Sequence, residues 1–250
     1  MDHTLKQNFL DRWYQYFGYA PLPFVFWYSD KVDDDVEHMQ SAKGWSCFIG
    51  DLAKVRSGRS LAFDNDAIGC GGGRRYLGFN KDIHPGFEYF LSCGNDDIEG
   101  ERYLRSPELV QKFLENAPYM PASASKIIFK RWDKLKEGDE PEVVVFFAQP
   151  DVLSGLFTLS AYDRGHLHGN ITPFGSGCAS IIQYPLAESK KDEPRGVLGM
   201  FDVSARPYVP AGTLSFAVPF KRFVQMINYM DESFLITKDW NKVRKRINTQ

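Results

Sequence analysis

The chain has 250 residues, with 30 Lys and Arg against 32 Asp and Glu, which gives a formal net charge of -2 at pH 7. A chain of this length buries about three quarters of its unfolded surface, so it needs no disulfide or metal to hold a core. The near-neutral charge argues against a dedicated binder of nucleic acid or of anionic membranes, because both need a basic excess. We therefore expect the partner to be a small, anionic ligand or another protein. The oligomeric state stays open.

The start of the chain carries charged side chains and no apolar run, so residues 1–19 match neither a signal peptide nor a transit peptide. No stretch approaches the roughly 18 apolar residues that a membrane span requires. These features predict a cytoplasmic protein. In a reducing cytosol, four cysteines are better explained as core residues, thiols or metal ligands than as disulfides.

Periodicity and turn residues predict the elements of the first half. Apolar residues at helical spacing predict a helix over 5–17, and the aromatic run 21–28, with prolines at its start, predicts a strand. We expect a loop with a short helical piece over 29–44. The glycine-dense stretch 45–80 predicts tight turns rather than regular structure.

The second half is predicted to alternate between strands and helices. Ser106 as N-cap and Pro107 at the first helical position predict a helix there. Further strands are predicted over 126–132, 142–148, 179–186, 196–203 and 213–218, and helices over 150–162, 220–230 and the basic, solvated end 239–250. The charged stretch 188–194 is expected to be an exposed hairpin loop. This mixed order favours an α+β fold in a single domain, residues 1–250, with a central mixed β-sheet and flanking helices.

Two regions around the cysteines follow a similar pattern. Cys47 and Cys70 are 23 residues apart, and Cys178 and Asp202 are 24 residues apart. In each region an arginine follows the second member by four residues and a tyrosine follows it by six: Arg74 and Tyr76, then Arg206 and Tyr208. Two explanations stay open, an internal pseudo-repeat and chance. A repeat would bring the four positions to one centre, with regions 44–80 and 175–210 forming one pocket.

Short motifs in these regions carry a family resemblance. They are a Pro-Phe-Val-Phe strand near the start, Gly-Asp-Leu-Ala-Lys after Cys47, Gly-Cys-Gly-Gly around Cys70, Gly-Ser-Gly-Cys-Ala around Cys178, and Asp-Val-Ser-Ala-Arg from Asp202. Over roughly residues 5–230 the chain resembles the domain of unknown function 169 family. The resemblance implies four cysteines in these contexts and no assigned activity. The fourth cysteine would fall at Asp202, so this chain departs from the pattern there, and Cys93 lies outside it.

The cysteine contexts suggest a metal centre. Thiolates bind zinc or iron–sulfur clusters, and glycines beside them let the backbone wrap a bulky inorganic core. Glycines flank Cys70 and Cys178, although no Cys-x-x-Cys pair is present. The candidate ligands are Cys47, Cys70, Cys178 and Asp202. A carboxylate is a harder donor than a thiolate, so this set could leave one iron of a cluster open to exchange or to a substrate, or it could accept zinc. Two alternatives remain, small buried hydrophobic residues and reactive redox thiols.

Other polar residues suggest an anion site and a histidine contribution. The stretch 69–75 favours an anion-binding loop, with Gly71, Gly72, Arg74 and Arg206 as candidate contacts to an anionic ligand or cofactor. The alternative pairs the two arginines with carboxylates such as those of Asp64, Asp66 or Asp202. His166 and His168 could join Cys178 if they lay on one strand face, or they could be exposed at a turn.

The leading hypothesis from the sequence is a metal- or iron–sulfur-binding protein, linked to redox chemistry. The alternative is a metal-free domain that binds a small ligand or a protein partner, with structural cysteines, and the aspartate at position 202 favours it. Nothing in the sequence distinguishes a catalyst from a sensor.

Overall fold

A computed structural model describes residues 1–248 of the chain. Its strands are β1 (Phe24–Ser29), β2 (Glu37–His38), β3 (Leu61–Phe63), β4 (Lys126–Arg131), β5 (Val143–Ala148), β6 (Asn170–Ile171), β7 (Gly196–Gly199) and β8 (Leu214–Pro219). Its α-helices are α1 (His3–Phe17), α2 (Phe48–Arg56), α3 (Gly71–Tyr76), α4 (Phe87–Phe90), α5 (Pro107–Asn116), α6 (Pro150–Leu159), α7 (Tyr184–Ser189), α8 (Phe220–Tyr229) and α9 (Lys238–Ile247). Short helical turns are η1 (Trp132–Lys134), η2 (Ala179–Gln183), η3 (Arg206–Tyr208) and η4 (Phe234–Ile236).

The strands form one mixed sheet of eight, in the order β2-β3-β4-β1-β5-β8-β7-β6. The outer pairs β2–β3 and β6–β7 are parallel, and all other pairs are antiparallel. Strand β5 is buried along its whole length, as its unbroken apolar sequence predicts. The α+β class with a central mixed sheet is confirmed. No helix formed by the described residues has the length and apolar content of a membrane span.

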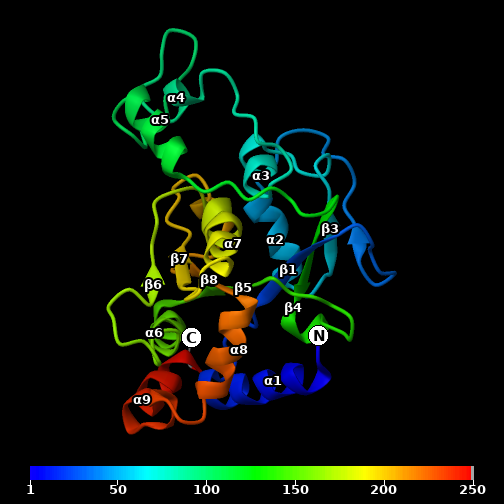
Figure 1. Cartoon of the computed structure of the whole chain (residues 1–250), viewed down its shortest axis with the longest axis vertical. Helices are drawn as coiled ribbons and strands as arrows, with labels where there is room; N and C mark the ends of the chain where they lie inside the picture. The colour runs from blue at the N-terminus through cyan, green and yellow to red at the C-terminus, as the bar shows by residue number, and fades with distance from the viewer. Residues whose placement is uncertain (249–250) are drawn as a thin grey trace.

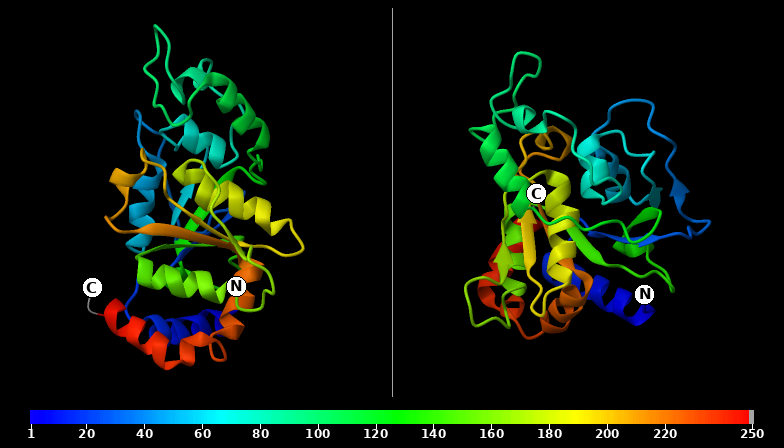
Figure 2. Two further views of the ribbon diagram at one scale, coloured as in Figure 1. Left: turned by 90° about the vertical axis from the view of Figure 1, so that its left-hand side faces the viewer. Right: turned by 45° about the horizontal axis from the view of Figure 1, so that its top comes forward.

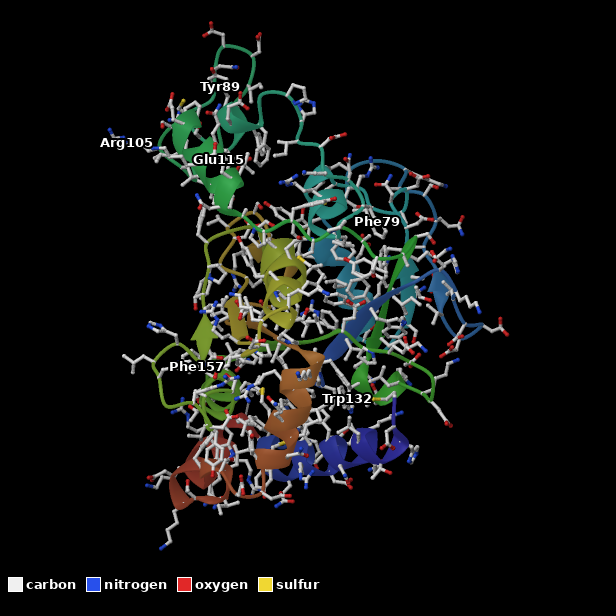
Figure 3. All side chains as sticks on the ribbon, in the orientation of Figure 1. Phe79, Tyr89, Arg105, Glu115, Trp132 and Phe157 are labelled. Atoms are coloured by element: carbon white, nitrogen blue, oxygen red, sulfur yellow. The ribbon has the colours of Figure 1, made fainter. Side chains whose placement is uncertain are left out.

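Alternating side chains of the central strands pack into two separate hydrophobic cores, one on each face of the sheet. Val144 and Phe146 pack into one core, and Val143, Val145 and Phe147 pack into the other, as the two-residue period of a strand requires. The first core is covered by α1, α6, α8 and α9, and the second by α2 and α7. Figure 2 shows the sheet between these helical layers, and in Figure 3 the labelled Trp132 lies between the sheet and α1.

The strand order is the same in both halves of the chain when each half is read from its edge to the centre. The first half gives β2-β3-β4-β1 and the second gives β6-β7-β8-β5, with the parallel pair at the edge each time. The helix that starts after Cys47 and the helical segment that starts after Cys178 follow the second strand of their half, and Cys70 and Asp202 follow the third. This agreement supports the internal pseudo-repeat, which itself stays a prediction.

One long excursion breaks the correspondence. Between α3 and β4 the chain forms α4 and α5, which project from the body in Figure 1. The matching connection in the second half runs from η3 to β8 in a few residues.

Several sequence predictions were wrong. Residues 179–186 form η2, which is a π-helical turn, and then α7, instead of a strand. The run contains Ile181, Ile182 and Tyr184, which suggest a strand. It is buried along its whole length, however, and the polar side chains of Ser180 and Gln183 are hydrogen-bonded. Because Pro185 has no N–H, it fits at the start of α7.

The glycine-rich stretch 45–80 is also more regular than predicted, because it contains α2, β3 and α3. Phe48, Leu52 and Val55 recur at helical spacing and bury one face of α2, which outweighs the cost of Gly50 in the helix. Region 29–44 contains the short strand β2 in place of a helical piece, and residues 190–195 connect α7 to β7, so 188–194 is not a hairpin loop. The C-terminal helix is confirmed by α9, while residues 249–250 lie outside the described part of the chain.

Candidate functional site

Each of the three predicted cysteine ligands lies directly before a helical segment. Cys47 precedes α2, Cys70 precedes α3, and Cys178 precedes η2. The Sγ atom of Cys70 accepts a hydrogen bond from the Gly73 amide at 3.3 Å. Asp202 begins the turn that leads into η3, since its carbonyl accepts hydrogen bonds from the amides of residues 205 and 206. Cys47 and Cys70 have extended backbones directly before their helices, whereas the backbone of Cys178 is already helical.

Within each half, the two loops that carry these residues touch. A Cβ atom added to Gly69 would collide with Ser46, so the loop before Cys70 lies against the loop before Cys47. In the second half, the Gly177 amide donates to Asp202 Oδ2 at 2.9 Å. The positions of each half are thus held side by side.

Contacts between the halves bring the two pairs together. The Tyr208 ring, from the second half, lies with its centroid 6.4 Å from that of Trp45, two residues before Cys47. Tyr76, from the first half, shares a hydrogen bond with Ser176, two residues before Cys178. The pattern is reciprocal, as a two-fold relation between the halves would require.

The acidic groups of the site are close enough to raise the pKa of two of its thiols, those of Cys47 and Cys178. Burial raises the pKa of the Cys178 thiol well above its ordinary value, and negative charge on Cys70, Cys47 and Asp202 raises it further. Burial also raises the pKa of Cys47; the amides of Gly50 and Ile49 oppose this, and Cys70 and Asp202 add to it. The structure therefore brings Cys47, Cys70, Cys178 and Asp202 into one electrostatic neighbourhood. Without a positive group, Cys47 and Cys178 stay protonated at neutral pH.

Tyr76 belongs to the same neighbourhood, and the sequence noted it only as part of the repeat. Burial raises the pKa of its hydroxyl, Arg75 and Ser176 oppose the rise, and Cys178 and Asp202 add to it. The π-helical turn after Cys178 is a second feature that sequence reasoning missed, and such turns are common at functional sites. Pro185, six residues into the segment, is a signal that could have indicated an irregular helix.

Met200, two residues before Asp202, has a strained backbone. Its φ is 68°, which residues other than glycine rarely adopt. The Met200 amide donates to Ser180 Oγ at 3.2 Å, and its Sδ atom lies beside Gly177. These contacts fix the turn that presents Asp202.

The carboxylate of Asp202 is held by three hydrogen bonds. Besides the Gly177 amide on Oδ2, its Oδ1 accepts from the Ser204 amide at 3.0 Å and from Ser204 Oγ at 2.8 Å. Asp202 thus joins its own turn to the loop of Cys178.

The predicted anion contacts divide into two kinds. Arg74 Nε donates to the Ile68 carbonyl at 2.9 Å, and Arg206 donates to the Thr213 carbonyl. In the described part of the chain neither forms an ion pair with Asp64, Asp66 or Asp202, so the suggested carboxylate pairing is wrong, and both arginines brace loops. Gly71 and Gly72 are exposed, and a Cβ atom on either would meet nothing within 4 Å. Anion binding at these glycines stays a prediction.

The two histidines lie at a different site. His166 Nε2 is 3.3 Å from Glu193 Oε2, and its Nδ1 accepts from the His168 amide. Both rings line a shallow surface pocket with residues 191–193 and Arg195. This position supports the exposed-turn explanation rather than ligation beside Cys178.

The donor set does not match a single metal ion. Over residues 1–248, no group of three or more His, Cys, Asp or Glu side chains is arranged to hold one ion. The expected zinc site is therefore not supported by this geometry.

The rim of the site is apolar and exposed. Trp45 is 71% exposed, Phe201 53% and Val203 68%. Phe174, four residues before Cys178, is also exposed, and it contacts Phe113 of α5.

Comparison with known proteins gives one match. The model of the DUF169 family, described as an uncharacterised ArCR family, matches residues 19–229, which is more than half of the chain. The chain belongs to this family. No curated protein and no solved structure matches it. DUF169 membership confirms the resemblance seen in the cysteine motifs and assigns no activity.

Proposed function

We propose that this DUF169 protein binds a thiolate-held metal centre through Cys47, Cys70 and Cys178, with Asp202 beside it, and that an iron–sulfur cluster fits better than zinc. The observation that carries the proposal is the convergence of the loops that hold these groups: Gly69 lies against Ser46, the Gly177 amide donates to Asp202, and Trp45 contacts Tyr208. Four loops from both halves of the chain bring them together. Unrelated buried cysteines would have no reason to converge in this way.

A cluster suits this arrangement better than a single ion. Its inorganic core separates the ligating sulfurs, whereas one zinc ion needs them within its own coordination sphere. The four groups interact electrostatically, yet they do not form a single-ion set within the described residues.

The electrostatics favour a cationic group at this place. Two of the thiols have raised pKa values, so ionising them beside a carboxylate is costly unless positive charge is added. A bound metal centre supplies that charge and releases the thiol protons. When bound, an iron–sulfur cluster would supply one-electron redox chemistry.

The glycines next to Cys70 also support a bulky group. Gly71 and Gly72 lie in a helix, where glycine costs up to about 1 kcal/mol relative to alanine. No atom of residues 1–248 lies within 4 Å of a Cβ atom built on either glycine. Room for something outside the chain explains why glycine stands at both positions.

Metal analysis of protein purified without oxygen tests the proposal. We expect stoichiometric iron and sulfide with a broad visible absorption band that fades on reduction. Cys70→Ala should lose the iron and the band. Cys93→Ala is the matched control, because Cys93 is exposed and has no part in the cluster of thiols, and it should keep both.

Other results would contradict the proposal. Zinc without iron would indicate a structural site instead. Colourless, metal-free protein whose stability is unchanged by Cys70→Ala would overturn the proposal altogether.

The second candidate is a metal-free domain that binds a small ligand or a protein partner. The exposed apolar rim of Trp45, Phe201 and Val203 favours it, because such side chains are common where molecules dock. Under this alternative Trp45→Ala would weaken partner binding, whereas Cys70→Ala would not.

A further inference from the structure

We propose that Cys47 and Cys70 form a reversible disulfide when a peroxide oxidises them, so that the pair acts as a redox-sensitive switch. The inference goes beyond the proposed function, because the bond forms without any metal. In a reducing compartment a disulfide is usually transient and redox-sensing rather than structural. This bond would join the start of α2 to the start of α3.

The first observation is that the two cysteine loops are packed against each other. A Cβ atom built on Gly69 would lie 2.7 Å from the Ser46 amide nitrogen, so the residues directly before the two cysteines are in backbone contact. A Cβ atom built on Gly73 would lie 2.9 Å from Cys70 Sγ and 3.3 Å from Phe48 Cβ. The Cys70 sulfur is therefore close to the residue that follows the other cysteine. A disulfide requires such an approach of two backbone segments.

The second observation is that both thiols are held weakly. The amides of Ile49 and Gly50 face the Cys47 sulfur, and the Cys70 sulfur accepts a hydrogen bond from the Gly73 amide at 3.3 Å. Sulfur is a weak acceptor. Each side chain can therefore rotate about its Cα–Cβ bond toward the other without breaking a strong interaction.

The third observation is that the other cysteines are less suited to the pair. Cys178 also lies near Cys70, but it is 7% exposed, whereas Cys47 and Cys70 are both partly exposed and can meet an oxidant. Cys93 lies in the excursion between α3 and β4. In the second half, Asp202 stands where the first half has Cys70, so only the first half offers two thiols.

The chemistry of the switch balances with one molecule of hydrogen peroxide. The thiolate of one cysteine attacks a peroxide oxygen, the O–O bond breaks, and a sulfenic acid and water are formed. The second thiol then attacks the sulfenic sulfur, so that the S–S bond forms and a second water leaves. The two thiols are oxidised to one disulfide, and the peroxide is reduced to water. A dithiol reductant reverses the bond by thiol–disulfide exchange.

Peptide mapping after peroxide treatment of the metal-free full chain tests the inference. The metal-free chain is used because Cys47 and Cys70 are also candidate ligands of the proposed centre. A Cys93→Ser background prevents bonds between molecules through the exposed thiol. After oxidation, the free thiols are blocked with N-ethylmaleimide in denaturant, and the digest is analysed by mass spectrometry.

We expect one cross-linked pair of peptides, which contains Cys47 and Cys70 and has lost two hydrogen atoms in mass. Cys178 should carry the maleimide. Treatment with dithiothreitol should restore both thiols. The same oxidation of the chain unfolded in urea should give a mixture of pairs, because the unfolded chain no longer holds the two loops together.

Two further variants in this background separate the pair from its neighbour. Cys178→Ser is the matched control and should keep the cross-link between Cys47 and Cys70. Cys47→Ser should lose it without forming another bond. The comparison of folded and unfolded chain needs neither variant, so the test stays decisive even if one of them fails to fold.

Three outcomes would overturn the inference. They are a cross-link between Cys70 and Cys178 in the folded chain, the same mixture of pairs in folded and unfolded chain, and oxidation of single thiols without any disulfide. A chain that never binds iron would overturn only the proposed function, because the mapping uses metal-free protein.

Discussion

Arg222 on α8 shows how a single buried charge is accommodated in this protein. Its guanidinium is fully buried and donates to the carboxylate of Asp163 and to the Ser160 carbonyl. The hydrogen bond from Arg222 lowers the pKa of Asp163 to about 2, against an opposing contribution from burial. The ion pair ties α8 to the end of the α6 segment.

The lowered pKa predicts a pH-dependent contribution to stability. Because the folded pKa of Asp163 is about 2 and its ordinary value is 3.8, the unfolded chain binds more protons between these values. The contribution is fully present above pH 3.8 and is lost as the pH falls through about 2. We expect Asp163→Asn to flatten this part of the stability curve, measured by urea unfolding from pH 5 to 2.

Asp239 provides the matched control. It also forms an ion pair, with Lys242, but its side chain is 90% exposed. Exposed pairs contribute little. Asp239→Asn should therefore leave the curve unchanged, and an equal effect of both variants would contradict the assignment to Asp163.

At the scale of elements, α3 is the helix whose sequence fits its structure least well. It is built of three glycines, two arginines and a tyrosine, and Gly73 alone has a steric reason for being glycine. A Cβ atom there would lie 2.9 Å from the Cys70 sulfur. Gly71 and Gly72 lower the stability of the helix, and no close packing against the described residues requires glycine at either position.

This mismatch predicts opposite effects for one substitution. Gly72→Ala should stabilise the metal-free chain by about 0.5–1 kcal/mol, because alanine is the better helix former and its Cβ atom meets no other atom. The same change should reduce iron loading, since the methyl group would occupy the space left for the cluster. Urea unfolding and iron analysis measure the two effects.

Gly155 on α6 gives the contrasting case. A Cβ atom at this position would lie 2.7 Å from the Phe17 ring and would also strike Trp240. Gly155→Ala should therefore destabilise the chain without affecting iron. A loss of stability from Gly72→Ala as well would show that α3 is tightly packed, contrary to our interpretation.

At the scale of the whole molecule, the excursion between α3 and β4 is attached at a narrow neck. The Gly78 carbonyl accepts hydrogen bonds from the Ala122 amide and from the Tyr119 hydroxyl, both at 3.0 Å. Between residues 81 and 117, all of which are described, only Ser92 and Val110 are fully buried. Figure 3 shows the labelled Tyr89, Arg105 and Glu115 on this projecting part.

The neck predicts that the excursion is dispensable for folding. We expect a chain in which a short Gly-Ser linker replaces residues 81–117 to keep the sheet and to unfold cooperatively. The free energy of unfolding should fall by no more than about 2 kcal/mol, since the main loss is the ring contact between Phe113 of the excursion and Phe174. Circular dichroism during urea unfolding measures both.

Phe113→Ala in the full chain removes that ring contact alone and should cost less than the deletion. A deletion variant without a cooperative transition would show that the excursion is part of the core.

The sequence by itself determined the elements with strong local signals. Local sequence alone predicts three elements: β5 from its apolar run, α1 from its helical spacing, and α5 from its Ser106-Pro107 start. The α+β class follows from the order of the predicted elements. The spacing of the cysteines left an internal repeat and chance both open, and only a repeat would bring the four positions to one centre. The resemblance to DUF169 rested on the same motifs.

Only the tertiary structure decided the rest, because long-range packing outweighed local preference. Residues 179–186 have a strand-like composition but form a π-helical turn and the start of α7. The helical form is favoured because it buries the run and lets the Gln183 side chain donate to the carbonyls of Tyr76 and Met120. The role of Asp202 was equally hidden, because its partner Gly177 is 25 residues away. A spacing can indicate which residues meet, but the hydrogen bonds that each one makes depend on the chain around it.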